Sequence, residues 1–142
     1  RRGEVMIPKF RAYDGGSLSR MYQPDEVMVG NGDIWIIDED SVAGEWIVNN
    51  DLNLMQSTGI RDITNQEIFE GDVVKTTRFV GRADEVGGFY EYDKEFIGIV
   101  KQLEGSWVID TGSDAVCLWT EIEENEIIGN IYENPELLEE KE

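Results

Sequence analysis

Apolar and polar residues alternate in short runs along most of the chain, which is the period-two pattern of half-buried β-strands. In residues 7–13, for example, Phe10 and Ala12 alternate with basic side chains. The same pattern predicts further strands at residues 27–29, 34–37, 45–48, 52–56, 73–77, 96–103, 106–110, 116–122 and 126–132. Many short strands separated by turn residues indicate a mainly β barrel or sandwich rather than alternating βαβ units.

Tight hairpins are predicted by the residues between neighbouring strands. Gly30-Asn31-Gly32-Asp33 tolerates the positive φ of a hairpin turn, and Glu104-Gly105 forms a two-residue loop. Asn49-Asn50-Asp51 predicts another hairpin between residues 45–48 and 52–56, although residues 52–56 also suit a short helical turn. The N-terminal part is therefore expected to be rich in β-hairpins.

The segment 67–75 is the strongest local signal, because an acidic glycine turn leads directly into a β-branched strand. We predict that Glu70, Gly71 and Asp72 form a structural turn, in which Gly71 takes a backbone conformation closed to other residues. A ligand site is the weaker alternative, since turn chemistry alone accounts for each residue type. The segment thus indicates a small β-barrel rather than a catalytic or ligand-binding site.

The segment 76–95 is long for a connection in a compact domain. It carries four aromatic residues that form a candidate interaction loop: Phe79, Phe89, Tyr90 and Tyr92. Long loops of this kind bind partners or contact other subunits. An extended hairpin that packs its own aromatic side chains is the slightly favoured alternative.

A short C-terminal helix is predicted at residues 134–140. Asn134 suits the N-cap, Pro135 suits the first helical position, and acidic residues follow early, where the helix dipole favours them. Leu137 and Leu138 are expected to dock this helix of one or two turns onto the barrel.

The charge is strongly acidic, at −19, with 31 acidic residues against 12 basic ones. This charge disfavours direct binding to nucleic acid or to anionic membranes. Nine of the acidic residues are Glu between Glu121 and Glu142, with Lys141 as the only base there. A solvated acidic surface is the favoured interpretation, and a docking surface for a basic partner is the alternative.

Candidate catalytic chemistry is sparse. The chain has no His, which removes the commonest general base and the usual zinc sites. Asp38-Glu39-Asp40 lacks the spaced ligands of a calcium loop, and Gly30-Asn31-Gly32 does not match a phosphate loop. We therefore expect a protein that is not an enzyme and has no cofactor, catalytic residue or metal site, with a carboxylate- and magnesium-dependent hydrolase as an open alternative.

The cysteine content and hydropathy bear on the compartment. Cys117 is the only cysteine, so an intramolecular disulfide is excluded and a reducing compartment is expected. Its apolar neighbours predict that it is buried. No stretch reaches the roughly 18 apolar residues of a membrane span, so a cytoplasmic protein without a membrane partner is predicted.

The aromatic content suggests self-association. Four Trp, five Tyr and five Phe are many for a small barrel with a narrow interior, so some are expected at an interface. The apolar neighbours of Trp35 and Trp107 predict that these two lie in the core. A homo-oligomer is the expected assembly.

Four landmarks span most of the chain: residues 6–14 (MIPKFRAYD), 54–60 (LMQSTGI), 66–74 (QEIFEGDVV) and 128–138 (IGNIYENPELL). In sequence and order they resemble the YopX-like family of phage and prophage proteins. The resemblance implies an SH3-like β-barrel in the second half, a β-rich N-terminal part and genes carried by temperate phages of Gram-positive bacteria, with no established activity. Asn65 stands where the family often has Gly, and the extended segment 76–95 also departs from it.

Together these observations predict one compact unit after an expression remnant at residues 1–5. It comprises a β-rich subdomain at residues 6–60 and an SH3-like barrel with the C-terminal helix at residues 61–142. The expected function is that of a non-catalytic phage accessory protein in the host cytoplasm, which self-associates and acts through protein contacts. The alternative is an acidic DNA mimic or inhibitor that occupies a basic host nucleic-acid-binding protein.

Overall fold

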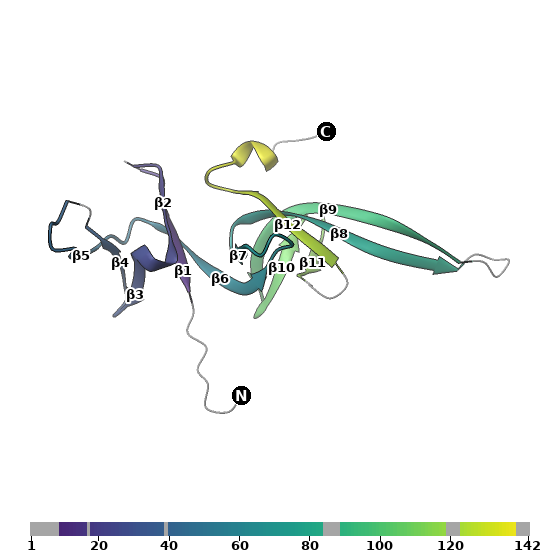
Figure 1. Cartoon of the computed structure of the whole chain (residues 1–142), viewed down its shortest axis with the longest axis horizontal. Coiled ribbons are helices and arrows are strands. Elements are labelled where there is room, and N and C mark those ends of the chain that lie inside the picture. The colour runs from purple at the N-terminus through teal and green to yellow at the C-terminus, as the bar shows by residue number, and fades with distance from the viewer. Residues whose placement is uncertain (1–8, 17, 39, 84–88, 119–122, 139–142) are drawn as a thin grey trace, which may run out of the picture. The chain divides into compact units, whose positions relative to one another are not determined.

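The computed structural model describes residues 9–138 except 17, 39, 84–88 and 119–122 (Figure 1). Its elements are β1 (Phe10–Asp14), β2 (Arg20–Tyr22), η1 (Pro24–Glu26), β3 (Val27–Gly30), β4 (Asp33–Ile37), β5 (Trp46–Val48), β6 (Asn53–Arg61), β7 (Glu67–Phe69), β8 (Asp72–Ala83), β9 (Phe89–Leu103), β10 (Ser106–Asp110), β11 (Ala115–Cys117), β12 (Glu123–Asn130) and η2 (Pro135–Leu138). The two η elements are 3₁₀ turns. The predicted mainly β class is confirmed.

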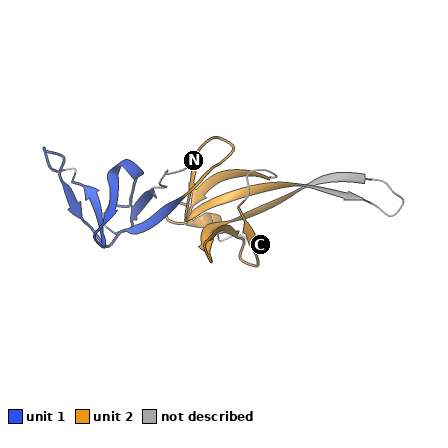
Figure 2. Ribbon diagram, turned by 90° about the horizontal axis from the view of Figure 1, so that it is seen from below, with its two compact units in different colours: residues 1–57 blue, residues 58–142 orange. Residues whose placement is uncertain are grey.

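The chain divides into two compact units, residues 1–57 and 58–142 (Figure 2). The division falls within β6, close to the subdomain boundary predicted after residue 60. Two strands in the described part, β2 and β7, were not predicted. Both have only three residues, which is too short for a clear alternating pattern.

The first unit contains the sheet β3-β4-β5, the paired strands β2 and β1, and the part of β6 up to residue 57, which pairs with β1. Its core is formed by Ala12, Tyr22, Val27, Ile36 and Leu52, with Phe10, Ile34 and Leu54 packed against them. The predicted hairpin between β3 and β4 is confirmed, because its turn residues Asn31 and Gly32 have φ of 53° and 80°.

The hairpin predicted at Asn49-Asn50-Asp51 is wrong in its pairing. Both flanking segments are strands, but β5 pairs with β4 and β6 pairs with β1. The side chain of Asn50 explains the difference: its Oδ1 accepts the backbone N–H of Ile34 at 2.8 Å, and its Nδ2 donates to Asp33 at 2.9 Å. The turn is thus fastened to the start of β4.

The second unit is built on the antiparallel sheet β11-β10-β9-β8-β12, which forms a half-barrel (Figure 1). Its core contains Ile68, Val74, Val100, Ile109 and Leu118. The predicted loop between β9 and β10 is confirmed, with Glu104 and Gly105 at φ of 51° and 84°. The described residues of the segment 76–95 lie in β8 and β9, which pair antiparallel from Thr76 to Ala83 on the β8 side, as the predicted extended hairpin requires.

A single 3₁₀ turn, η2, stands where a short helix of one or two turns was predicted at residues 134–140, of which 139 and 140 lie outside the described residues. The N–H of Leu137 donates to the carbonyl of Asn134 at 3.0 Å, a bond between residues three apart. The side chain of Asn134, expected as an N-cap, accepts the backbone N–H of Asn130 at 3.1 Å. The segment is therefore shaped by its attachment to the end of β12.

Two predicted burials are also corrected. Cys117 is exposed on β11. Leu118 lies in the core, and because successive side chains of an extended chain point to opposite faces, the neighbouring Cys117 points away from it. Trp35 is half-buried on the face of β4 opposite to the core residue Ile36. Trp107 packs against the second core, as predicted.

Candidate functional site

The predicted turn residues join several strands of the second unit. Gly71 has φ of 88°, donates its N–H to the carbonyl of Val100 at 2.9 Å and accepts the N–H of Ile131 at 3.0 Å. The buried carboxylate of Asp72 accepts the N–H of Phe69 at 2.8 Å. These contacts connect β7, β8, β9 and the chain after β12. The geometry of the turn is therefore explained by its structural role in joining these strands.

The candidate interaction loop lies on the extended hairpin. In the backbone register, Val80 is opposite Tyr92, and Ala83 is opposite Phe89. The side chains of Phe79, Phe89, Tyr90 and Tyr92 lie outside the described residues, as does the loop 84–88 itself. The interaction loop therefore stays a prediction.

Asp62 is a buried carboxylate at the start of the turn that precedes β7. Its oxygens accept the N–H and the hydroxyl of Thr64 at 2.9 and 2.7 Å, the N–H of Gln66 at 2.9 Å and the N–H of Ile127 at 3.1 Å. Burial alone raises the pKa of Asp62, but these hydrogen bonds outweigh it and lower the pKa below its ordinary value. The carboxylate fastens the turn to β12.

Two further polar pairs connect β8 and β12. The hydroxyl of Thr76 donates to Asn125 at 2.8 Å in the interior, and Arg78 forms an ion pair with the buried carboxylate of Glu123. Arg78 also lies over the ring of Phe96, 5.4 Å from its centroid. In the residues that the structure describes, no group of three or more Asp, Glu or Cys is placed to hold a metal ion.

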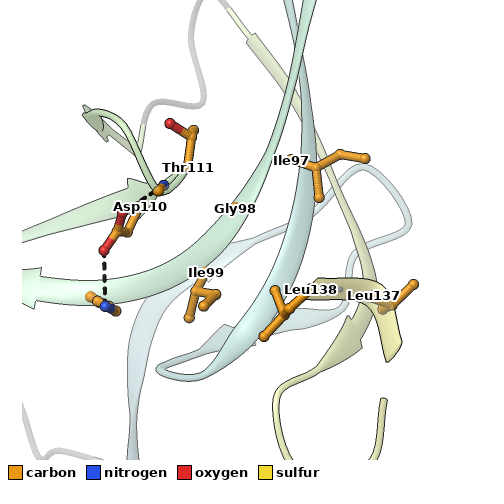
Figure 3. Close-up of a pocket in the computed structure, with 9 residues that line it drawn as sticks. Ile97, Gly98, Ile99, Asp110, Thr111, Leu137 and Leu138 are labelled. Atoms are coloured by element: carbon orange, nitrogen blue, oxygen red, sulfur yellow. Dashed lines mark hydrogen bonds and ion pairs between the residues drawn. The ribbon is translucent and has the colours of Figure 1, made fainter. Parts of the chain in front are cut away.

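A groove of about 470 Å³ lies between β9, η2 and the turn after β10 in the second unit (Figure 3). Residues of β9, the end of β10, the turn after it and η2 line the groove: Ile97, Gly98, Ile99, Lys101, Asp110, Thr111, Gly112, Leu137 and Leu138. Lys101 donates to Asp110 at 2.9 Å. This bond and the N–H of Gly112 lower the pKa of Asp110. The groove therefore offers apolar walls and a neutralised ion pair.

The sheet β3-β4-β5 of the first unit exposes a second apolar surface. Met28 is opposite Trp35, and Trp35 is opposite Val48, so these three side chains form one row across a face of the sheet. Ile37 and Trp46 form the neighbouring row on the same face. We call these five residues the apolar sheet face. Met28, Trp46 and Val48 are exposed, while the other two are half-buried.

The strand β5 is exposed on both of its faces. Trp46, Ile47 and Val48 keep 36%, 43% and 44% of their surface accessible. In the described part of the chain, β5 is bordered by β4 alone. The sequence shows three consecutive apolar residues here, which leaves the strand without a polar face. The alternating pattern predicts a strand at residues 45–48, but this apolar run is the signal from which its exposure could be inferred.

Several comparisons place the chain among known proteins. The family model described as YopX protein matches residues 9–139. A solved structure, protein EF1440 from Enterococcus faecalis, is 24% identical with a TM-score of 0.55, over 95% of this chain and 100% of that one. No curated protein matches. No helix in the described residues is long and apolar enough to cross a membrane. Because the family model covers nearly the whole chain, the protein belongs to the YopX family.

Proposed function

We propose that the chain is a non-catalytic accessory protein of a phage or prophage, which self-associates and acts through protein contacts in the host cytoplasm. It requires no cofactor, and neither nucleic acid nor membrane is its direct partner. The phage origin rests on the sequence landmarks. We interpret the half-barrel of the second unit as an SH3-like barrel on the same basis.

The observation that carries this proposal is the apolar sheet face together with the exposed strand β5. Contiguous exposed apolar surface marks contact sites, and Trp and Met are enriched at protein interfaces. Here Trp46 and Val48 are exposed on one face of the strand and Ile47 on the other. Burial of these side chains against a partner removes apolar surface from water and favours association.

Light scattering over a concentration series tests the proposal. We expect the mass to rise above the monomer mass of 16.2 kDa as the concentration increases. Trp46→Lys should suppress this rise, because a charge on the apolar sheet face is costly to bury. Leu103→Lys is the matched control, since Leu103 is also an exposed apolar residue but lies in the second unit. A monomeric mass at all concentrations would refute self-association.

The charge supports a second function, an acidic inhibitor of a basic nucleic-acid-binding protein. The excess of 31 acidic over 12 basic residues gives a surface that attracts basic proteins at a distance. An affinity pull-down from bacterial lysate, eluted with rising salt, tests this alternative. A stoichiometric basic protein released at moderate salt would favour the inhibitor and contradict self-association as the whole function.

A further inference from the structure

The hydrogen bonds between β4 and β5 determine which backbone groups face the open edge. The carbonyl of Glu45 accepts the N–H of Asp38 at 2.7 Å, and the N–H of Asn49 donates to the carbonyl of Ile34 at 2.8 Å. The bonding direction alternates along an antiparallel strand. Odd-numbered positions of this strand therefore face β4, and the two even-numbered residues of β5 direct their N–H and C=O groups to the open edge.

An open edge of this kind is a template for another strand. Most natural edges are protected by charged residues, by proline or by a covering segment. Trp46, Ile47 and Val48 include neither a charge nor a proline, and no described segment covers them. The edge thus offers backbone hydrogen bonds and apolar side chains in the same three residues.

The sequence of the strand is complementary to itself in one antiparallel register. With a two-fold axis at Ile47, Trp46 is opposite Val48 of the partner subunit, and the reverse pair follows by symmetry. Both of these residues direct their backbone groups outward, so each pair exchanges two hydrogen bonds. The aromatic side chain of Trp46 and the β-branched side chain of Val48 then lie side by side on one face, which is a favourable cross-strand pair.

The charges also fit this register. Glu45 is opposite Asn49 of the partner subunit, so a carboxylate faces an amide and like charges do not meet directly. To attract a basic peptide, the edge strand would need carboxylate side chains. Trp46, Ile47 and Val48 carry none. The edge itself therefore favours an uncharged strand as its occupant, and a second copy supplies one.

We propose that two copies pair their β5 strands antiparallel about Ile47 and join two three-stranded sheets into one sheet of six strands. The inference rests on the proposed self-association and specifies its interface. Because each strand contributes only three residues, the buried area is below the roughly 800 Å² per partner of a stable complex. We therefore expect a reversible equilibrium between monomer and dimer.

Disulfide cross-linking tests the register. In a Cys117→Ala background, Ile47→Cys should form a disulfide-linked dimer on mild oxidation, because non-hydrogen-bonded partners have Cα atoms about 4.5 Å apart, within disulfide range. Val42→Cys is the control: Val42 is fully exposed and precedes β5 in the chain by four residues. We expect the Ile47→Cys variant to cross-link about tenfold faster than the control, because strand pairing holds the two substituted residues within disulfide distance.

A proline substitution provides a second test. Val48→Pro removes an N–H that points to the open edge, so the monomer should retain its fold, as checked by circular dichroism. In the Ile47→Cys background it should abolish cross-linking. A dimer in which both cysteine variants cross-link at equal rates would refute the β5 pairing but leave self-association intact. A monomeric mass for the unmodified chain would refute both proposals.

Discussion

Asp62 connects two segments of the second unit through one carboxylate, which accepts hydrogen bonds from Thr64, Gln66 and Ile127. Asp62→Asn replaces one accepting oxygen with an amide donor, so a buried N–H loses its partner. We expect the free energy of unfolding at pH 7 to fall by about 1–3 kcal/mol, measured by urea denaturation. Asp51→Asn is the control, because Asp51 is exposed, and should have little effect.

The loss of stability on Asp62→Asn should depend on pH. Hydrogen bonding lowers the pKa of Asp62 in the folded state. Between the folded-state pKa and the higher unfolded-state pKa, the unfolded chain therefore binds more protons than the folded chain. The stabilisation is complete above the unfolded pKa and disappears as the pH falls through the folded pKa. The difference between wild type and variant should therefore shrink below about pH 5. A constant difference down to the acid limit of folding would contradict this assignment.

Gly98 is required by the close approach of β9 and β10. A Cβ atom added there would lie 2.6 Å from the carbonyl oxygen of Asp110 and 2.7 Å from Ile109. Gly98→Ala should destabilise the chain by about 1–3 kcal/mol, through overpacking. Gly30→Ala is the matched control, because Gly30 is also in a strand but has no atom within 4 Å of the added Cβ. Equal urea midpoints for the two variants would refute this packing argument.

At the scale of elements, η2 is held to β12 by asparagine side chains. The Oδ1 of Asn130 accepts the N–H groups of Tyr132 and Glu133 at 3.0 and 2.8 Å, and its Nδ2 donates to Glu133 at 2.8 Å. Asn130→Ala removes these bonds. We expect amide exchange in residues 131–138 to accelerate about tenfold or more, as loss of over 1.4 kcal/mol of local stability implies.

The expected effect of Asn130→Ala is confined to the C-terminal segment. Exchange in the first unit should remain unchanged, which provides an internal reference. Asn53→Ala is the matched substitution control, since Asn53 is exposed in β6. Faster exchange throughout the second unit would mean that Asn130 supports the whole half-barrel, and unchanged exchange would mean that its hydrogen bonds do not hold η2.

The sequence predicted the elements whose causes are local. The turns Gly30-Asn31-Gly32-Asp33 and Glu104-Gly105 were found because tight hairpins require residues that accept positive φ. The partner of β5 was missed because it depends on Asn50 contacting the start of β4, sixteen positions earlier in the chain. The residue types of a turn do not reveal a contact with a residue so far away in the sequence.

The candidate surface was predictable only in part. Aromatic abundance predicts an interface, and the interaction loop predicted within the segment 76–95 stays a prediction because its aromatic side chains lie outside the described residues. The run of Trp46, Ile47 and Val48 is visible in the sequence, yet its exposure follows from the position of β5 at the end of a sheet. Strand order is set by non-local pairing, so an edge strand and a central strand can share the same sequence pattern.

For the whole molecule, the net charge of −19 opposes the association of two copies. Each copy repels the other before any strand contact forms, and dissolved salt screens this repulsion. The dimer proposed here is held by backbone hydrogen bonds and apolar contacts, which salt does not screen. Self-association and binding to a basic partner therefore predict opposite responses to ionic strength.

We expect the dissociation constant of the dimer to decrease when NaCl is raised from about 0.05 M to about 0.5 M, over which the Debye length falls from roughly 14 Å to 4 Å. Sedimentation equilibrium at both salt concentrations measures this change. Val48→Pro should remain monomeric in both, which separates screening at the β5 interface from a general salting-out of apolar surface. Association that weakens with salt would instead indicate ionic contacts and refute an interface formed by the uncharged strand β5.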